Sequence, residues 1–176
     1  GDFHIAYCPE RVLPGNILQE LVSNDRVIGG INKKSTEEAK KLYQSFCNGK
    51  LFSTNSRTAE LVKLAENTYR DVNIAFANEI SMIADNLDIN YSDVISLANR
   101  HKRVNILKPG CGVGGHCIAV DPWFIASSSP ELSLMTKSAR RVNNEKSKWV
   151  ATKIINCIKI YRENHGKEPC VGCLGL

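Results

Sequence analysis

The sequence predicts a mainly α-helical protein in which a short α/β segment precedes two long helices. Residues 56–87 contain neither proline nor glycine, and their apolar residues recur at the spacing of one helix face. The same pattern returns in residues 132–164. Residues 1–55 instead alternate short strand-like runs with turns rich in glycine, proline and asparagine, which is typical of an α/β fold.

The α/β segment is expected to contribute three strands and one helix. Strands are predicted at residues 3–7, 25–30 and 51–53. Turn-forming residues follow or flank each of these runs. The run Ser35-Thr36-Glu37-Glu38 has the form of a capping box and is expected to begin a helix that Asn48-Gly49 closes. A sheet of this size is not stable alone, so the segment looks like part of a larger α/β domain.

The helical part is expected to begin near residue 56 with one helix of roughly 45 Å, at about 1.5 Å per residue. Shorter helices are predicted at residues 91–100 and 117–126, and a second long helix ends at Asn164-His165-Gly166. Long helices bury their apolar stripes against each other or against a second copy of the chain. We therefore expect these stripes to form a core or a homodimer interface.

The last residues, 168–176, are predicted to form a strand that enters a glycine turn. A strand without partners is not a stable ending. Together with the absence of an initiator methionine, this favours a fragment of a longer protein.

Composition narrows the classes of function. The net charge is +5, but the basic residues are interspersed with acids and lack interleaved aromatic residues, so solvated faces are favoured over nucleic-acid binding. No apolar run approaches the roughly 20 residues that cross a bilayer, and no signal sequence opens the chain. A cytoplasmic protein without membrane contact is expected.

The cysteines are odd in number and scattered, so free thiols are expected rather than a disulfide framework. A zinc site could be drawn from Cys111, His116, Cys117 and the pair Cys170 and Cys173, but their spacing lacks the repeated short pairs of zinc sites. No metal is expected.

The loop from Pro109 to Trp123 carries four glycines within residues 110–115 and leads to Cys117. Glycine-rich loops let a ligand approach the backbone closely. If Cys117 begins the predicted helix, first-turn N–H groups would favour its thiolate. Taken alone, Cys117 would be a buried structural thiol, but the loop and Asp121 one turn later favour a nucleophile.

Lys63, Asn67 and Arg70 lie on one face of the first long helix, which is either a solvated stripe or a site. Glu10 follows the first strand, where loops of open α/β sheets present ligand-binding groups, although a solvent-facing turn is equally consistent. Arg11 beside it can bind phosphate or carboxylate oxygens.

His101 and Arg103, just before the glycine loop, can bind the same kinds of oxygen, although surface placement is the default for each.

Several ordered motifs resemble the nucleotide-sugar 6-dehydrogenase family, which comprises UDP-glucose and GDP-mannose dehydrogenases. They lie at residues 7–15, 24–30, 59–67, 73–79 and 112–121. Within the family, the Glu-Arg-Val-Leu-Pro-Gly turn, the Asn-Arg-His run and Gly-Val-Gly-Gly-His-Cys before Asp-Pro-Trp-Phe are most similar to the branch that oxidises UDP-N-acetyl-D-mannosamine.

The resemblance implies three parts. Residues 1–55 would be the C-terminal end of a Rossmann-type NAD-binding domain, residues 56–166 a helical central domain that dimerises, and residues 167–176 the first strand of a truncated nucleotide-sugar-binding domain. Residues 1–55 contain no Gly-x-Gly-x-x-Gly fingerprint for NAD. The fragment itself is therefore expected to be inactive and to hold NAD weakly or not at all.

The resemblance also implies roles in a four-electron, NAD-dependent oxidation of the sugar C6 alcohol to a carboxylate. Cys117 would form a thiohemiacetal and then a thioester. Lys63 and Asn67 would handle the C6 oxygen, while Glu10 and Asp121 would activate and position water. The residues expected to grip the UDP-sugar are Arg11, Val12, Lys63, Asn67, Arg70, His101, Arg103, which could serve the partner subunit's site, and Gly114.

The sequence departs from the family pattern at three positions. Many relatives carry a second glutamate where Pro14 stands, some carry a lysine at Val120, and Cys111 is unexpected. The alternatives are a UDP-N-acetylglucosamine or UDP-glucose 6-dehydrogenase, or a module that only dimerises. Sugar stereochemistry and pathway do not follow from these residues.

Overall fold

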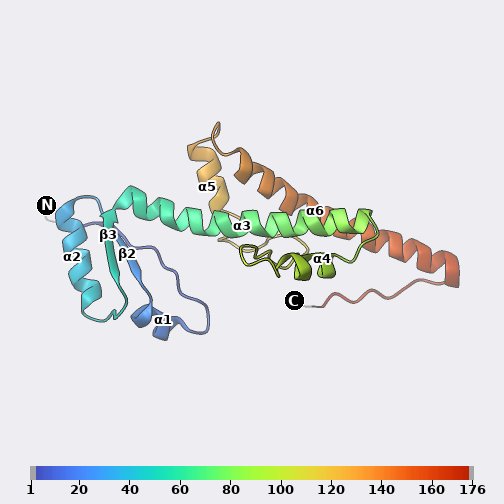
Figure 1. Cartoon of the computed structure of the whole chain (residues 1–176), viewed down its shortest axis with the longest axis horizontal. Coiled ribbons are helices and arrows are strands. Elements are labelled where there is room, and N and C mark those ends of the chain that lie inside the picture. The colour runs from blue at the N-terminus through green and yellow to red at the C-terminus, as the bar shows by residue number, and fades with distance from the viewer. Residues whose placement is uncertain (1–2, 175–176) are drawn as a thin grey trace. The chain divides into compact units, whose positions relative to one another are not determined.

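The computed structural model describes residues 3–174, in which six helices and three strands form. The contacts divide the chain after Thr68 into two compact units, and the boundary lies inside the long helix α3 (Ser56–Asn86) (Figure 1). Each unit is described by itself. No helix in residues 3–174 is long and apolar enough to cross a membrane.

The first unit contains a three-stranded sheet with β2 (Arg26–Gly30) at its centre. β1 (Ala6–Tyr7) pairs with β2 antiparallel, and β3 (Leu51–Asn55) pairs with it parallel. β2 is largely buried, with Ile28 fully so, because it has a strand on each side and α2 packs against it. The three predicted strands are thus confirmed.

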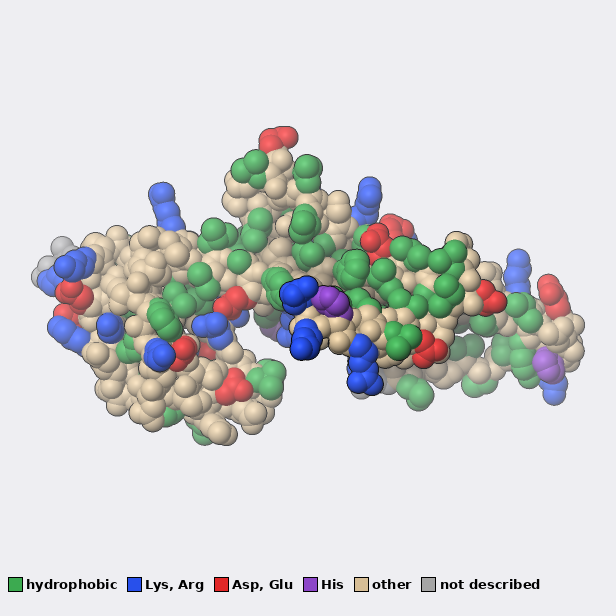
Figure 2. All heavy atoms as spheres, in the orientation of Figure 1, with side chains coloured by type: hydrophobic (Ala, Val, Ile, Leu, Met, Phe, Trp, Pro, Cys, Tyr) green, Lys and Arg blue, Asp and Glu red, His purple; other side chains and the backbone are tan. Residues whose placement is uncertain are grey.

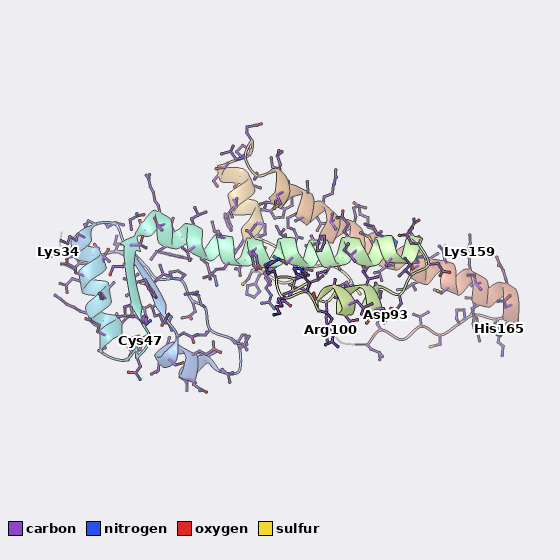
Figure 3. All side chains as sticks on the ribbon, viewed as in Figure 1. Lys34, Cys47, Asp93, Arg100, Lys159 and His165 are labelled. Carbon is purple, nitrogen blue, oxygen red and sulfur yellow. The ribbon has the colours of Figure 1, made fainter. Side chains whose placement is uncertain are left out.

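Helix α2 (Lys33–Gln44) begins before the predicted capping box, so that part of the prediction is wrong. Asn32 has extended backbone and its side-chain oxygen accepts the Ser35 N–H at 2.8 Å, which makes Asn32 the N-cap. Thr36 lies in the first turns and its hydroxyl accepts the Gly30 N–H at 3.0 Å. Figure 3 shows Lys34 at the start of this helix and Cys47 beyond its end.

Helix α1 (Ile17–Ser23) was not predicted. Its N-cap residue, Asn16, makes no side-chain capping bond, and none of its residues is buried. A short helix without a buried stripe leaves little periodic signal in a sequence.

The second unit is helical, as predicted. It contains the later part of α3, then α4 (Tyr91–Ala98), α5 (Asp121–Ser128) and α6 (Leu134–His165). Gly166 ends α6 in the left-handed region at φ 62°, and its N–H bonds the Arg162 carbonyl. The two long helices are confirmed. Buried small residues such as Ala75, Ala84 and Ala139 lie on these two helices.

The predicted helix at residues 117–126 begins at Asp121 instead, so Cys117 is not a first-turn residue. Pro122 has no N–H to donate and is therefore favoured in the first turn of a helix. Residues 115–120 form turns, in which the Cys117 carbonyl accepts the N–H groups of Val120 at 3.1 Å and Asp121 at 2.9 Å.

The strand predicted at the end of the chain is not found in residues 167–174, which have no regular structure. A strand forms only when a neighbouring strand pairs with it, and none pairs with this segment in the described part of the chain. Gly175 and Leu176 lie outside the described residues.

The C-terminal half of α6 carries exposed apolar side chains, including Ile154, Ile155 and Ile160. Of these, Ile154 lines a cavity of about 530 Å³ together with Pro169 and Val171. Figure 2 shows hydrophobic side chains gathered on the visible face of the second unit. Cys157 is also exposed, so the predicted stripe is buried only in part within one copy of the chain.

Candidate functional site

The first unit brings two of the predicted catalytic residues together. The Lys63 ammonium, from α3, donates to the backbone carbonyl of Glu10 at 2.6 Å. The Glu10 carboxylate accepts the N–H groups of Arg11 at 2.7 Å and Val12 at 3.0 Å on one oxygen. Its other oxygen accepts a hydrogen bond from Arg26 at 3.1 Å. The turn after β1 is thereby fixed against α3.

These contacts decide the charge of Glu10. Burial raises the pKa of its carboxyl, but the N–H groups of Arg11 and Val12 and the Arg26 guanidinium together bring the pKa below its ordinary value. The side chain is still 53% exposed. Glu10 is therefore an ionised carboxylate that water or a substrate can reach, and its lowered pKa makes it a weaker base than an ordinary glutamate.

Arg26, which the sequence did not single out, bonds the Glu10 carboxylate. Its side chain is 3% exposed, and besides Glu10 it bonds the Leu21 carbonyl at 3.1 Å and lies over the Tyr43 ring at 5.5 Å. Buried charges in proteins are paired, so a charged residue at the start of a buried strand was the available signal. Arg26 orients the Glu10 carboxylate.

Of the other predicted binding residues, Arg11 and Asn67 lie in the first unit with this cluster. Arg11 forms an ion pair with Glu66 of α3 at 2.9 Å, and each side chain is 37% exposed. Asn67 is half-buried one turn after Lys63. Arg70 is exposed and falls in the second unit.

The second unit holds the predicted nucleophile. Cys117 is exposed and makes no disulfide, and the turn after it leads directly to Asp121 at the start of α5. Gly114 and Gly115 precede it, and a Cβ at either position would meet nothing within 4 Å. The loop therefore presents a thiol next to open backbone, where a ligand can approach.

His101 and Arg103 lie in the turn that follows α4, near the labelled Arg100 (Figure 3), and both are exposed. The Arg103 N–H approaches His101 Nδ1 at 3.3 Å. The Asn99 side chain closes the loop by donating to the Ile106 carbonyl at 3.0 Å and accepting its N–H at 2.7 Å. This leaves the side chains of His101 and Arg103 on a solvent-facing loop.

A cavity of about 470 Å³ lies where β2 and β3 end beside α2. A Cβ on Gly29 would lie 2.5 Å from the Asn55 carbonyl oxygen, and one on Gly30 would lie 2.4 Å from the Thr36 nitrogen. Both glycines thus serve packing of the protein itself, and we assign no cofactor contact to this cavity.

No group of three His, Cys, Asp or Glu side chains within residues 3–174 is arranged to bind a metal ion. The seven cysteines are unpaired by disulfides.

The fold and these residues define a class. Residues 57–145 match the central domain of the UDP-glucose/GDP-mannose dehydrogenase family, and residues 1–47 match the NAD binding domain of the same family. The chain belongs to the UDP-glucose/GDP-mannose dehydrogenase family.

Individual relatives narrow the comparison. The chain is 55% identical over all 176 residues to a UDP-N-acetyl-D-mannosamine dehydrogenase of Campylobacter jejuni, of which it covers 42%. It is 53% identical over 176 residues to an NDP-N-acetyl-D-galactosaminuronic acid dehydrogenase of Ralstonia nicotianae, of which it covers 40%. A UDP-D-ManNAc dehydrogenase structure from Pyrococcus horikoshii matches 92% of the chain and 38% of its own length, with TM-score 0.85 and 46% identity.

The chain thus spans about two fifths of the length of these relatives.

Proposed function

We propose that the chain forms the central part of an NAD-dependent dehydrogenase that oxidises the C6 alcohol of a UDP-N-acetylhexosamine to the uronate. UDP-N-acetyl-D-mannosamine is the proposed substrate. The observation that carries this proposal is the match over all 176 residues to a UDP-N-acetyl-D-mannosamine dehydrogenase. The contact between Lys63 and the Glu10 turn supports it further.

In this proposal the residues of the chain handle the sugar carbon and the protons. The Lys63 ammonium and the Asn67 amide bond the C6 oxygen as it gains or loses a proton. The Cys117 thiolate adds to the C6 aldehyde, and the thiohemiacetal becomes a thioester after loss of a hydride. Two molecules of NAD+, bound one after the other, would each accept one hydride of the oxidation.

Hydrolysis of the thioester requires a base and a positioned water. The Glu10 carboxylate is ionised and reachable, so it can take the proton of the attacking water. Asp121, at the start of α5, helps to hold that water. Attack breaks the carbon–sulfur bond, which releases the uronate and returns Cys117 to its starting state.

We also propose that the chain contains segments of the three domains that its resemblance to the family implies. Residues 1–55 would end an NAD-binding domain, residues 56–166 would form a dimerising centre, and residues 167–176 would open a nucleotide-sugar-binding domain. The exposed apolar side chains of α6 support dimerisation through the long helices. The chain alone would not turn over, and the whole protein would act in the cytoplasm.

The UDP-sugar would be held by cationic side chains and open backbone. Arg70, His101 and Arg103 are exposed and can donate charge-assisted hydrogen bonds to diphosphate oxygens. Arg11, Val12 and Gly114 complete the proposed binding set. Arg103 would serve the partner subunit's site.

A second substrate is favoured by one observation. The Ralstonia relative is named for an N-acetyl-D-galactosaminuronic acid and is almost as similar to the chain as the Campylobacter relative. An NDP-N-acetyl-D-galactosamine is therefore the alternative substrate, and the choice rests on which nucleotide sugar supports turnover.

The test is NADH production by a protein of the relatives' length that carries this chain. Nucleotide sugars with N-acetylmannosamine, N-acetylgalactosamine, N-acetylglucosamine, glucose and mannose are compared. We expect fastest turnover of UDP-N-acetyl-D-mannosamine, at two NADH per uronate. Cys117→Ala should abolish uronate formation while nucleotide-sugar binding persists, and Cys173→Ala, at another exposed thiol, should leave turnover intact. Turnover of no nucleotide sugar, or wild-type turnover by Cys117→Ala, would overturn the proposal.

A further inference from the structure

The base of the glycine loop is held by side chains from two helices of the second unit. The Gly110 N–H donates to Asn78 Oδ1, on α3, at 2.9 Å. The Ser147 hydroxyl, on α6, donates to the carbonyl oxygen of Cys111 at 2.7 Å. Gly110 and Cys111 are therefore held through a backbone N–H and a backbone carbonyl. A substitution at either position would leave these backbone groups in place.

Asn78 is fully buried, and its orientation is set by its neighbours. Its Nδ2 donates to Asn143 Oδ1 at 2.9 Å, and Asn143 Nδ2 donates to Asp71 Oδ1 at 2.8 Å. The same Asp71 oxygen accepts a hydrogen bond from Arg140 at 2.7 Å, so Asn143 must turn its amide nitrogen toward it. The side-chain oxygen of Asn143 therefore accepts the hydrogen bond from the Asn78 amide nitrogen. The side-chain oxygen of Asn78 then faces Gly110.

The carboxylate of Asp71 thus fixes the direction of every hydrogen bond in this row, and Arg140 holds Asp71 at 2.7 Å. Reversing any one amide would place two donors or two acceptors face to face in a buried site. Such a mismatch costs about 1–3 kcal/mol per unsatisfied group. The row therefore has one strongly favoured arrangement.

Gly112 shows how closely the loop lies against α6. Its φ is +135°, and an added Cβ would lie 2.4 Å from Ser147 Oγ and 3.0 Å from the Asn143 carbonyl oxygen. By contrast, the space around Gly114 and Gly115 is open. The loop is anchored at its base and open near Cys117.

We propose that Asn78, oriented by Asn143 and Asp71, is a positioning residue that holds the base of the glycine loop so that Cys117 is presented in a reactive geometry. Ser147 provides a second, weaker anchor. The catalytic consequence rests on the proposed function, whereas the effect on loop order does not. Misplacing a reacting group by about 1 Å can cost on the order of 100-fold in rate, so the anchor should act on turnover.

The first test is kinetic. In the full-length protein, Asn78→Ala should lower kcat by about 10- to 100-fold and change KM for the nucleotide sugar by less than about threefold. The control is Asn73→Ala, because Asn73 donates to the Tyr69 carbonyl of its own helix. The control should keep kcat within about twofold.

A conservative variant separates positioning from loss of stability. A protonated aspartate at position 78 reproduces the pattern of asparagine, with O–H toward Asn143 and a carbonyl oxygen toward Gly110. Asn78→Asp should therefore retain kcat near pH 6 and lose it as pH rises and the new carboxyl ionises, relative to wild type at each pH. A pH profile parallel to that of wild type would contradict the orienting row.

Ser147→Ala keeps the inference testable if Asn78→Ala does not fold, because Ser147 is exposed. We expect a two- to fivefold fall in kcat, against no change for Ser138→Ala at another exposed position of α6.

Hydrogen exchange of the peptide containing residues 112–118 provides a readout that does not need activity. Asn78→Ala or Ser147→Ala should raise its exchange rate at least threefold. If the wild-type protein oxidises no nucleotide sugar, the proposed function fails, and faster exchange still supports the positioning role. Unchanged exchange, or wild-type kcat in both Asn78→Ala and Ser147→Ala, would overturn it.

Discussion

Each unit of the molecule contains one buried arginine paired with a carboxylate, and the two pairs differ in what they leave open. Arg26 meets Glu10 at 3.1 Å in the first unit, and Arg140 meets Asp71 at 2.7 Å in the second. The arginine side chains are 3% and 4% exposed. Glu10, however, is 53% exposed and Asp71 is 0% exposed.

The difference separates a carboxylate that can do chemistry from one that organises the core. Glu10 is held on one side and reaches water on the other, so it can exchange a proton during a reaction. Asp71 has no such access, and its charge instead orients Asn143. A buried charge is tolerated only with a partner, so the two pairs should respond very differently to substitution.

The largest effect is expected for Asp71→Ala. This change leaves the Arg140 guanidinium buried without its carboxylate and should lower the free energy of unfolding by about 3–5 kcal/mol. Urea unfolding followed by circular dichroism measures it. Asp71→Leu combined with Arg140→Met removes both charges and should recover much of the loss. A loss below about 1 kcal/mol for Asp71→Ala would remove the distinction between the pairs.

Arg26→Met should cost less, about 1–2 kcal/mol, because water can solvate the half-exposed Glu10. The pKa of Glu10 should rise toward its ordinary value, which carboxyl ¹³C NMR can follow. In the wild type this lowered pKa contributes stability above the unfolded value of about 4.5, and the contribution is lost as pH falls through the folded pKa. An unchanged Glu10 titration in Arg26→Met would show that backbone N–H groups suffice.

Much of the fold follows from local sequence. The long helices were predictable because residues 56–87 and 132–164 lack proline and glycine, and Gly166 supplied the expected end. The starts of α2 and α5 were not predicted correctly. At α2 two capping candidates compete within four residues, and Asn32 wins over Ser35 because Thr36 is needed at the sheet.

The candidate site likewise contains residues that the sequence indicates and residues that only the structure reveals. Glu10 and Lys63 could be singled out as residue types in a plausible place, and the structure brings them together. Arg26 and Asn78 were not singled out, because their contacts are with partners distant in sequence. For Arg26, a charge at the start of a buried strand was the available local signal. Charged and amide residues on predicted strands and helices are usually assigned to the surface, and only tertiary packing reveals that these are buried.

Lys146 extends the comparison to a buried cation. Its ammonium bonds the Ser81 hydroxyl at 2.7 Å and lies 3.9 Å from the centre of the Trp149 ring. Burial lowers the pKa of Lys146 from its ordinary 10.5, although Asp85 and Cys111 act to raise it. Unlike Arg140, it is held by a neutral hydroxyl and an aromatic face.

Lys146→Met should therefore be stabilising, by about 1 kcal/mol at pH 7, since it removes the cost of burying the charge. Between the lowered folded pKa and the unfolded value, the unfolded state binds more protons, so wild-type stability rises with pH across this window. The advantage of the variant should shrink as pH approaches 10.5. Urea unfolding at several pH values measures this, and a pH-independent difference would exclude the charge as its cause.

The smallest effect is expected for the ion pair between Arg11 and Glu66, whose side chains are each 37% exposed. Solvent screens such a pair, so its coupling energy should lie at about 0–1 kcal/mol. A double-mutant cycle with Arg11→Met and Glu66→Gln, followed by urea unfolding at low and high salt, measures it. A coupling energy above about 2 kcal/mol, unaffected by salt, would mean that exposure does not separate weak pairs from strong ones in this chain. Catalysis should respond more, because the Arg11 side chain belongs to the proposed binding set for the UDP-sugar. The backbone N–H of residue 11, which bonds Glu10, is kept in Arg11→Met. Arg11→Met should therefore raise KM for the nucleotide sugar while leaving the pH dependence of kcat unchanged.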